Sequence, residues 1–182
     1  MNVCFVVLAH HQPRVFHRLL RALSGPGRDT VVHVDKKVGI QPFLDESGPE
    51  VHYVPRRRSV YWGGWSLTKA IIGSLAHALT VSDANYFMYL GGTDFPIRPH
   101  HELDARLEEL GPDSLINYYP LVPGTWGYGL IDRYQLIDLK TMLVDERSAV
   151  SPPNLEVRTR LRERVVKLER QMYAHHGPRD TT

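Results

Sequence analysis

The sequence has a single cysteine and no long apolar run. Cys4 lies in an apolar stretch near the N-terminus, so no disulfide can form within the chain, and this scarcity is typical of a reducing compartment. No stretch of 18 apolar residues predicts a membrane span. The first residues, MNVCFVVLAHH, have neither the basic start nor the small-residue cleavage site of a signal peptide. We therefore expect a cytoplasmic protein with no membrane span.

Several short motifs that mark common enzyme classes are also absent. The sequence has no G-x-G-x-x-G and no G-x-x-x-x-G-K-[ST], which argues against dinucleotide cofactors and P-loop chemistry. It has no G-x-S-x-G, no H-E-x-x-H and no D-x-D, and its adjacent histidine pairs would face opposite ways on a strand. We therefore expect no metal site and no cofactor. A bound diphosphate would have to be neutralised by lysine and arginine side chains.

The composition that remains is that of a soluble globular domain. The chain has 182 residues, of which 42% are hydrophobic and 23% charged, enough for one core. The net charge of +2 is too small to indicate a nucleic-acid partner. The basic run Arg56-Arg57-Arg58 is predicted to be solvated surface.

Strand-like and helix-like segments alternate along the first 119 residues. The run VCFVVLA, residues 3–9, is apolar and β-branched, as in a strand buried on both faces. Further strands are predicted at 30–35, 51–54, 85–92 and 114–119, and helices from Pro13 to Gly25 and over 66–79, 100–110 and 155–172. In the helix over 66–79 we expect Ser66 as the N-cap, with these residues facing inward: Leu67, Ala70, Ile71, Leu75 and Leu79. The alternation predicts an α/β fold with an open, mostly parallel sheet flanked by helices.

Polar residues and glycines follow the predicted strands where those strands end. Ligands of open parallel sheets bind beyond the carboxyl ends of the strands, which directs attention to Asp35, Asp94 and the stretch SVYWGGWSLTKA. Asp35 has two readings: it could accept hydrogen bonds from a ribose or base, or it could be satisfied by Lys36, Lys37 or the next turn. Asp94, in GGTDFP, could likewise meet a ligand or simply complete a turn.

Four motifs, in one order and spacing across residues 3–98, make the sequence recognisable. They are VVLAHHQP, VVHVDKK, SVYWGGWSLTKA and YFMYLGGTDFPIR, and together they resemble the core-2/I-branching enzyme family, which includes the peptide O-xylosyltransferases. The resemblance implies a GT-A type, Rossmann-like fold. It also implies an inverting glycosyltransferase that moves GlcNAc or xylose from a UDP-sugar to a carbohydrate or other hydroxylated acceptor. Family members need no D-x-D metal, and this sequence is similar to them in that respect.

The resemblance also implies a donor site. By motif, its residues would be Leu8, Asp35, Val60, Tyr61, Trp62 and Asp94. Leu8 would line the nucleotide pocket, Asp35 would contact the uridine, and residues 60–62 would form a wall for the base and ribose. Asp94 would lie near the donor sugar. Trp65 is predicted to be a core residue at the start of its helix.

Members of the family continue beyond the point that matches Thr182, with a segment that carries the catalytic base and a diphosphate clamp. We therefore expect a single domain over 1–182, truncated at its C-terminus, with a nucleotide-sugar-binding half at 1–119 and the start of an acceptor half at 120–182. No catalytic residue is assigned, and Asp94 is the first candidate. Three hypotheses stay open: an active transferase, alone or completed by a downstream polypeptide; an inactive nucleotide-sugar-binding remnant; and a nucleotide-binding protein outside the family.

Overall fold

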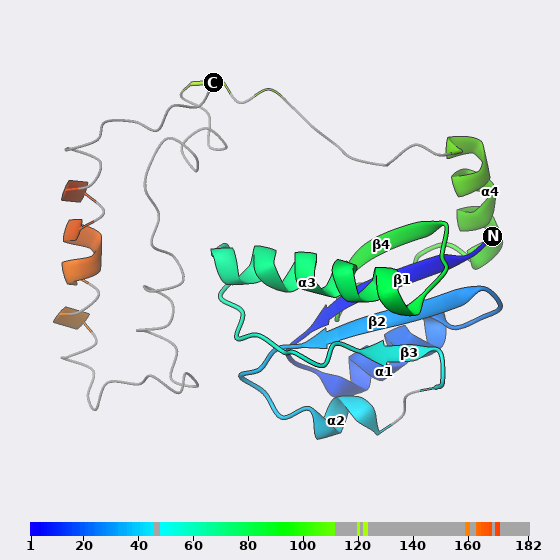
Figure 1. Ribbon diagram of the computed structural model, residues 1–182, viewed down its shortest axis with the longest axis horizontal. Helices are drawn as coiled ribbons and strands as arrows, with labels where there is room; N and C mark the ends of the chain where they lie inside the picture. Colours follow the sequence, from blue (N-terminus) through cyan, green and yellow to red (C-terminus); the bar gives the residue numbers. More distant parts are fainter. Residues whose placement is uncertain are drawn as a thin grey trace. The chain divides into compact units, whose positions relative to one another are not determined.

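The computed structural model describes residues 1–45, 48–111, 120, 122–123, 159–160, 163–168 and 170–171. Its elements, in chain order, are β1 (Val3–Ala9), α1 (Pro13–Leu23), β2 (Arg28–Val34), α2 (Gln41–Leu44), β3 (Val51–Tyr53), α3 (Trp65–Val81), β4 (Tyr86–Gly91) and α4 (His100–Leu110) (Figure 1). The described residues of the helix predicted over 155–172 are helical. The strand predicted at 114–119 lies outside the described residues.

Within the described part of the chain, the strands form one parallel sheet of four, in the order β3-β2-β1-β4 (Figure 1). β1 is central: it pairs with β2 from Val3 opposite Arg28 onward, and with β4 from Val3 opposite Tyr86 onward. All seven residues of β1 are buried, as its unbroken apolar sequence predicts. The predicted α/β arrangement is confirmed, and it is consistent with a GT-A-like fold.

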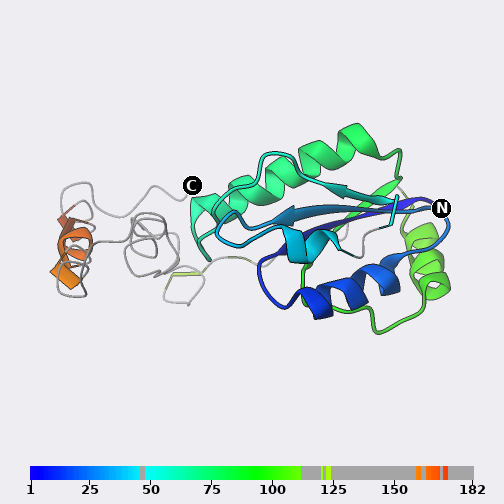
Figure 2. The same cartoon turned by 90° about the horizontal axis from the view of Figure 1, so that it is seen from below.

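Helices cover both faces of the sheet. Figure 2 shows α3 on one side and α1 on the other. Successive side chains of a strand point to opposite faces, so the odd-numbered residues of β1 pack with Phe16 of α1 and Leu107 of α4. Cys4 and Val6 point the other way and pack with Ala78 of α3. The sheet is therefore the middle layer of three.

Cys4 lies in the apolar layer between the sheet and α3. The side chain is fully buried, and this burial raises the pKa of the thiol to about 11, although a hydrogen bond with Ser82 acts in the opposite direction. The cysteine is therefore a neutral, structural thiol at physiological pH.

Helix α3 packs through a face that shares only Ala70 with the inward residues that the sequence predicts, so the prediction is confirmed for Ala70. Its buried residues follow one another at intervals of four and are all small: Ser66, Ala70, Ser74 and Ala78. The predicted inward residues Leu75 and Leu79 are 39% and 62% exposed. Small side chains let the helix backbone come close to the sheet, and the Ser74 hydroxyl is satisfied within the helix by donating to the Ala70 carbonyl at 2.7 Å. Ser66 lies inside the helix, whose first residue is Trp65, so its prediction as the N-cap is wrong.

The chain divides into two compact units. One contains Met1–Val60 and Ser66–Asp113, which include the sheet, and the other contains Tyr61–Trp65 and Ser114–Thr182. The single domain over 1–182, with its two halves, stays a prediction. Among the described residues, no helix combines the length and apolar character that crossing a membrane requires.

Candidate functional site

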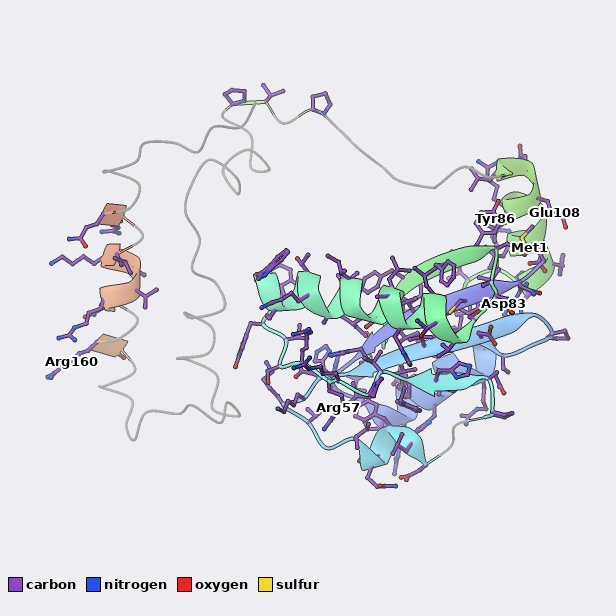
Figure 3. All side chains as sticks on the ribbon, in the orientation of Figure 1. Met1, Arg57, Asp83, Tyr86, Glu108 and Arg160 are labelled. Atoms are coloured by element: carbon purple, nitrogen blue, oxygen red, sulfur yellow. The ribbon has the colours of Figure 1, made fainter. Side chains whose placement is uncertain are left out.

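Three strand ends meet at one edge of the sheet. The strand register places Leu8 of β1 between His33 of β2 and Gly91 of β4. Beyond the ladder, the amide of Asp35 donates to the carbonyl of Ala9 at 2.8 Å. Arg57 lies toward this end of the sheet and Met1 toward the opposite end (Figure 3). Two of the predicted donor residues, Leu8 and Asp35, are therefore neighbours on the carboxyl edge, where ligands of parallel sheets bind.

Asp35 is buried at this edge, with its side chain 7% exposed; one carboxylate oxygen is hydrogen-bonded and the other faces a cation. Oδ1 accepts the amide of Lys37 at 2.8 Å, and Oδ2 lies 3.9 Å from the ammonium nitrogen of Lys37. The reading in which the next turn satisfies Asp35 therefore holds. The same Oδ1 also accepts the amide of Val60 at 3.4 Å, so the carboxylate ties the end of β2 to a second predicted donor residue.

The segment before Val60 is held against the end of β2 by hydrogen bonds that involve both side chains and backbone. Nε2 of His33 accepts the amide of Arg58 at 2.9 Å, and the carbonyl of Arg58 accepts the amide of Lys36 at 3.0 Å. The guanidinium of Arg57 donates to the carbonyls of Asp35, at 3.4 Å, and Val38, at 3.0 Å. His33 was not predicted as a site residue, and Arg57 was predicted to be solvated surface, whereas it is half-buried and donates to two carbonyls. A polar histidine inside the buried strand VVHVD was the signal available for His33.

The charge state of His33 follows from its surroundings. Burial lowers the pKa of the imidazole below its ordinary value of 6.5, and the carboxylate of Asp35 acts in the opposite direction. The cations Arg57 and Arg58 lower it further. His33 is therefore neutral at pH 7, which leaves Nε2 as an acceptor for the Arg58 amide.

Tyr61 follows Val60 directly, and the tryptophan pair, Trp62 and Trp65, comes next. Tyr61 is buried and Trp62 is 86% exposed, and between the tryptophans the amide of Gly64 donates to the carbonyl of Tyr61 at 3.0 Å. Gly63 has a φ of 75°, a left-handed conformation that favours glycine. The prediction that Trp65 is a core residue is wrong, because it is 61% exposed. Trp65 comes one residue before Ser66, the first of the small buried residues of α3. One residue corresponds to about 100° around the helix axis, so Trp65 is on a different face.

The end of β4 closes into a tight turn against β1. The amide of Gly92 donates to the carbonyl of Leu8 at 2.7 Å, and a Cβ added to Gly92 would lie 2.9 Å from the Cα of Ala9. Asp94 is exposed; its amide donates to the Gly91 carbonyl at 3.0 Å, and its Oδ2 accepts the Gly91 amide at 2.7 Å. The turn reading of Asp94 therefore holds, while its contact with a donor sugar stays a prediction.

Positive side chains are available at the same edge. Lys36, Arg56 and Arg58 are exposed, and the backbone bond between Lys36 and Arg58 keeps two of them adjacent. Among the described residues, no group of three or more His, Cys, Asp or Glu side chains could hold a metal ion. The edge thus offers cations for an anionic ligand.

A family model described as "Core-2/I-Branching enzyme" matches residues 3–172, which is most of the chain. The chain belongs to the Core-2/I-branching enzyme family. This confirms the resemblance carried by its four motifs.

Curated members similar to this Core-2/I-branching chain carry two kinds of name. A xylosyltransferase of Ciona intestinalis is 27% identical over 57% of this chain and 13% of its own length. The β-1,3-galactosyl-O-glycosyl-glycoprotein β-1,6-N-acetylglucosaminyltransferase 3 of Mus musculus is 26% identical over 84% of this chain and 36% of its own length. Its counterpart in Ovis aries is 28% identical over 86% and 37%. The chain therefore spans little more than a third of the length of these relatives at most.

The structure places some of the predicted donor residues of this Core-2/I-branching chain side by side and leaves others linked only through the chain. It brings Leu8, Asp35 and Val60 together at the carboxyl edge through register and hydrogen bonds. Asp94 follows β4, whose last residue is paired with Leu8. Tyr61 and Trp62 are linked to this group through the chain that continues from Val60. The contact of any of these residues with a ligand stays a prediction.

Proposed function

We propose that this chain binds a UDP-sugar at the carboxyl edge of its sheet, as the donor-binding part of an inverting, metal-independent glycosyltransferase. The donor sugar would be GlcNAc or xylose, because the named relatives are N-acetylglucosaminyltransferases and a xylosyltransferase. The acceptor would be a hydroxyl group of a carbohydrate or glycoprotein. Family membership supports the reaction class.

The observation that carries this proposal is the bond between Asp35 and the amide of Val60. Their two motifs are 25 residues apart in the chain, yet one carboxylate oxygen joins them, at 3.4 Å. A buried acidic residue just past a parallel strand is where nucleotide-binding sheets recognise a ribose or base. Asp35 would supply the remaining acceptor capacity of its carboxylate to the uridine, and Trp62 would supply an exposed aromatic surface.

The diphosphate would be held by positive side chains. Lys36, Arg56 and Arg58 are exposed. Lys36 follows Asp35 directly, the Arg58 carbonyl accepts the Lys36 amide, and Arg56 comes two residues before Arg58. Guanidinium and ammonium groups form charge-assisted hydrogen bonds with phosphate oxygens. They would meet the charge that a D-x-D motif and its divalent cation meet in other sugar-nucleotide enzymes.

A second candidate function is nucleotide-sugar binding without transfer by this chain alone. One observation favours it: the first candidate for the catalytic base, Asp94, already uses one carboxylate oxygen to accept the Gly91 amide in its own turn. A general base typically contributes about 10²- to 10⁴-fold to a rate, so a chain that lacks one would turn over very slowly. A polypeptide supplied in trans could provide the base in that case.

Calorimetric titration with UDP, followed by a UDP-release assay with UDP-GlcNAc and UDP-xylose, tests both candidates. A transferase binds UDP in preference to ADP and releases UDP from one of the two donors when an acceptor is added. Preferential UDP binding without release supports the second candidate. If UDP and ADP bind equally weakly, the donor site proposed at this edge is wrong.

A further inference from the structure

Loop 55–60 follows β3. After β3 has ended, a side chain of β2 still attaches this loop to β2. β3 ends at Tyr53, and the last strand-like bond to β2 runs from the Val54 amide to the Val32 carbonyl at 2.9 Å. Four residues later, Nε2 of His33 accepts the Arg58 amide at 2.9 Å. The imidazole nitrogen therefore accepts the hydrogen bond that a strand carbonyl would otherwise accept. It satisfies a donor that the ladder no longer reaches.

The bond fixes the residues on both sides of Arg58. The Arg58 carbonyl accepts the Lys36 amide at 3.0 Å, so both backbone polar groups of Arg58 are bonded to β2 or to the turn after it. Two residues further on, the Val60 amide reaches Asp35 Oδ1 only at 3.4 Å, which is a long bond. The long bond depends on its neighbours for geometry, and the two well-formed bonds of Arg58, to His33 and to Lys36, are the nearest anchors.

We propose that His33 is a positioning residue for the donor site, whose neutral Nε2 holds the backbone of Arg58–Val60 in place against Asp35. The inference rests on the proposed UDP-sugar site and adds to it a residue that touches no ligand. His33 is 2% exposed and lies beneath the edge, so it acts through Arg58 and Val60. Its effect is on how well the site is formed before the donor arrives.

The protonation state decides whether His33 can act in this way. An imidazolium carries a proton on each ring nitrogen, so protonation would turn an N–H of His33 against the N–H of Arg58. Burial, with Arg57 and Arg58 nearby, lowers the pKa of His33 below 6.5, while Asp35, itself paired with Lys37, raises it less. On the neighbouring strand β1, the residue paired with His33 is the apolar Leu8. The bond is thus complete at neutral pH and is lost as the pH falls through a value below 6.5.

The test compares three proteins by UDP titration between pH 5 and 7.5. His33→Leu removes the acceptor, and His33→Gln keeps a polar side chain that can accept a hydrogen bond but does not titrate. We expect His33→Leu to weaken UDP binding about three- to tenfold at pH 7.5, and His33→Gln to restore most of it. The ratio of wild-type to His33→Gln affinity should fall as the pH falls. Titration of the UDP phosphate cancels in that ratio, because both proteins bind the same ligand.

His17→Gln is the matched control, since His17 is a buried histidine of α1 whose ring bonds the Pro42 carbonyl at 2.8 Å. It should leave UDP affinity unchanged. Amide exchange of Arg58, measured by NMR without ligand, should be slow in the wild type and at least about tenfold faster in His33→Leu. If wild type binds UDP but His33→Leu binds equally well and the ratio to His33→Gln does not change with pH, the positioning role is wrong and the donor site stands. If wild type does not bind UDP at any pH, the donor site fails and the positioning role with it.

Discussion

Asp35 connects two segments of the chain through one carboxylate. Its Oδ1 accepts amides from Lys37 and Val60, and its Oδ2 faces the Lys37 ammonium. A buried carboxylate in such a position has a structural role whether or not a ligand is present, because leaving a buried charge or an amide unpaired is costly. Its two readings, ligand and turn, are therefore compatible: the turn contacts leave room for the proposed contact with a ligand.

Asp35→Asn should weaken UDP binding about tenfold or more while the fold survives, because asparagine keeps the shape and one acceptor but removes the charge. Asp83→Asn is the matched control, since Asp83 is an exposed aspartate at the other end of the sheet from Arg57 (Figure 3). Calorimetric titration of both variants, with a thermal melt of each, measures the difference. Equal UDP affinities for the two variants would remove Asp35 from the site.

Gly92 provides a test of the close approach between β4 and β1. Gly92→Ala should lower the free energy of unfolding by about 1–3 kcal/mol, because the new methyl would meet the backbone of Ala9 at 2.9 Å. Gly73→Ala is the control: nothing lies within 4 Å of a Cβ there, and alanine in the interior of α3 should stabilise by about 0.5–1 kcal/mol. Urea denaturation gives both values. A neutral Gly92→Ala would show that the turn relaxes at little cost.

At the scale of elements, the sheet could be predicted and the face of α3 could not. The run over β1 is apolar at every position, and the only common architecture for such a strand is a sheet covered on both sides. In α3 the leucines and the small residues both recur at helical spacing, so periodicity alone does not say which stripe is buried. The prediction for Trp65 was also wrong. Its large apolar side chain suggested burial, but the small residues set which face of the helix is buried, and Trp65 is not on that face.

The motifs point to the proposed donor residues, but not to the contacts that hold those residues in place. Leu8, Asp35 and Val60 could be named from the sequence because each lies in a recognisable motif. The bonds of His33 and Arg57 to loop 55–60 depend on how that loop returns to β2, which no local pattern encodes. Supporting contacts of this kind are long-range in sequence and become visible only in the structure.

The small-residue face of α3 leads to a prediction about size. Ala78→Leu should destabilise the fold by about 1–3 kcal/mol, because Ala78 is fully buried in a cluster with Cys4 and Val6 and a larger side chain would overpack that layer. Leu79→Gln, on the adjacent exposed position, should change the free energy of unfolding by less than about 0.5 kcal/mol. Chemical denaturation of the two variants checks this. The reverse order of effects would mean that α3 packs through its leucines, as periodicity suggested.

For the whole molecule, the net charge of +2 is small, so any attraction for a nucleotide diphosphate must come from local charge. Lys36, Arg56 and Arg58 are exposed at the carboxyl edge, where the proposed donor would lie. Exposed charges act over about 8 Å at physiological ionic strength and over less in concentrated salt. The recognition of phosphate by this edge should therefore depend on salt and not on a divalent cation.

UDP binding should persist in excess EDTA and should weaken about threefold or more when NaCl is raised from roughly 50 to 500 mM. Arg58→Ala should flatten this salt dependence, because it removes one of the exposed cations. Arg106→Ala, in the exposed ion pair with Glu109 on α4, should leave it unchanged. Titrations at several salt concentrations, with and without EDTA, give the slopes. A strict requirement for Mg²⁺ or Mn²⁺ would contradict metal independence.

The buried thiol of the central strand can be used to measure unfolding, because it becomes reactive only when the structure opens. Cys4 is the only cysteine in the sequence, it is fully buried, and its pKa is raised to about 11, so an alkylating reagent can reach a reactive thiolate only after the layer between β1 and α3 has opened. At pH 8, labelling of the native protein should be slower than labelling of the urea-unfolded chain by several orders of magnitude. Ala78→Leu should accelerate it by about tenfold for each 1.4 kcal/mol of stability lost, and Leu79→Gln should not. A single mass measurement over time would thus follow the opening of the sheet without any added probe.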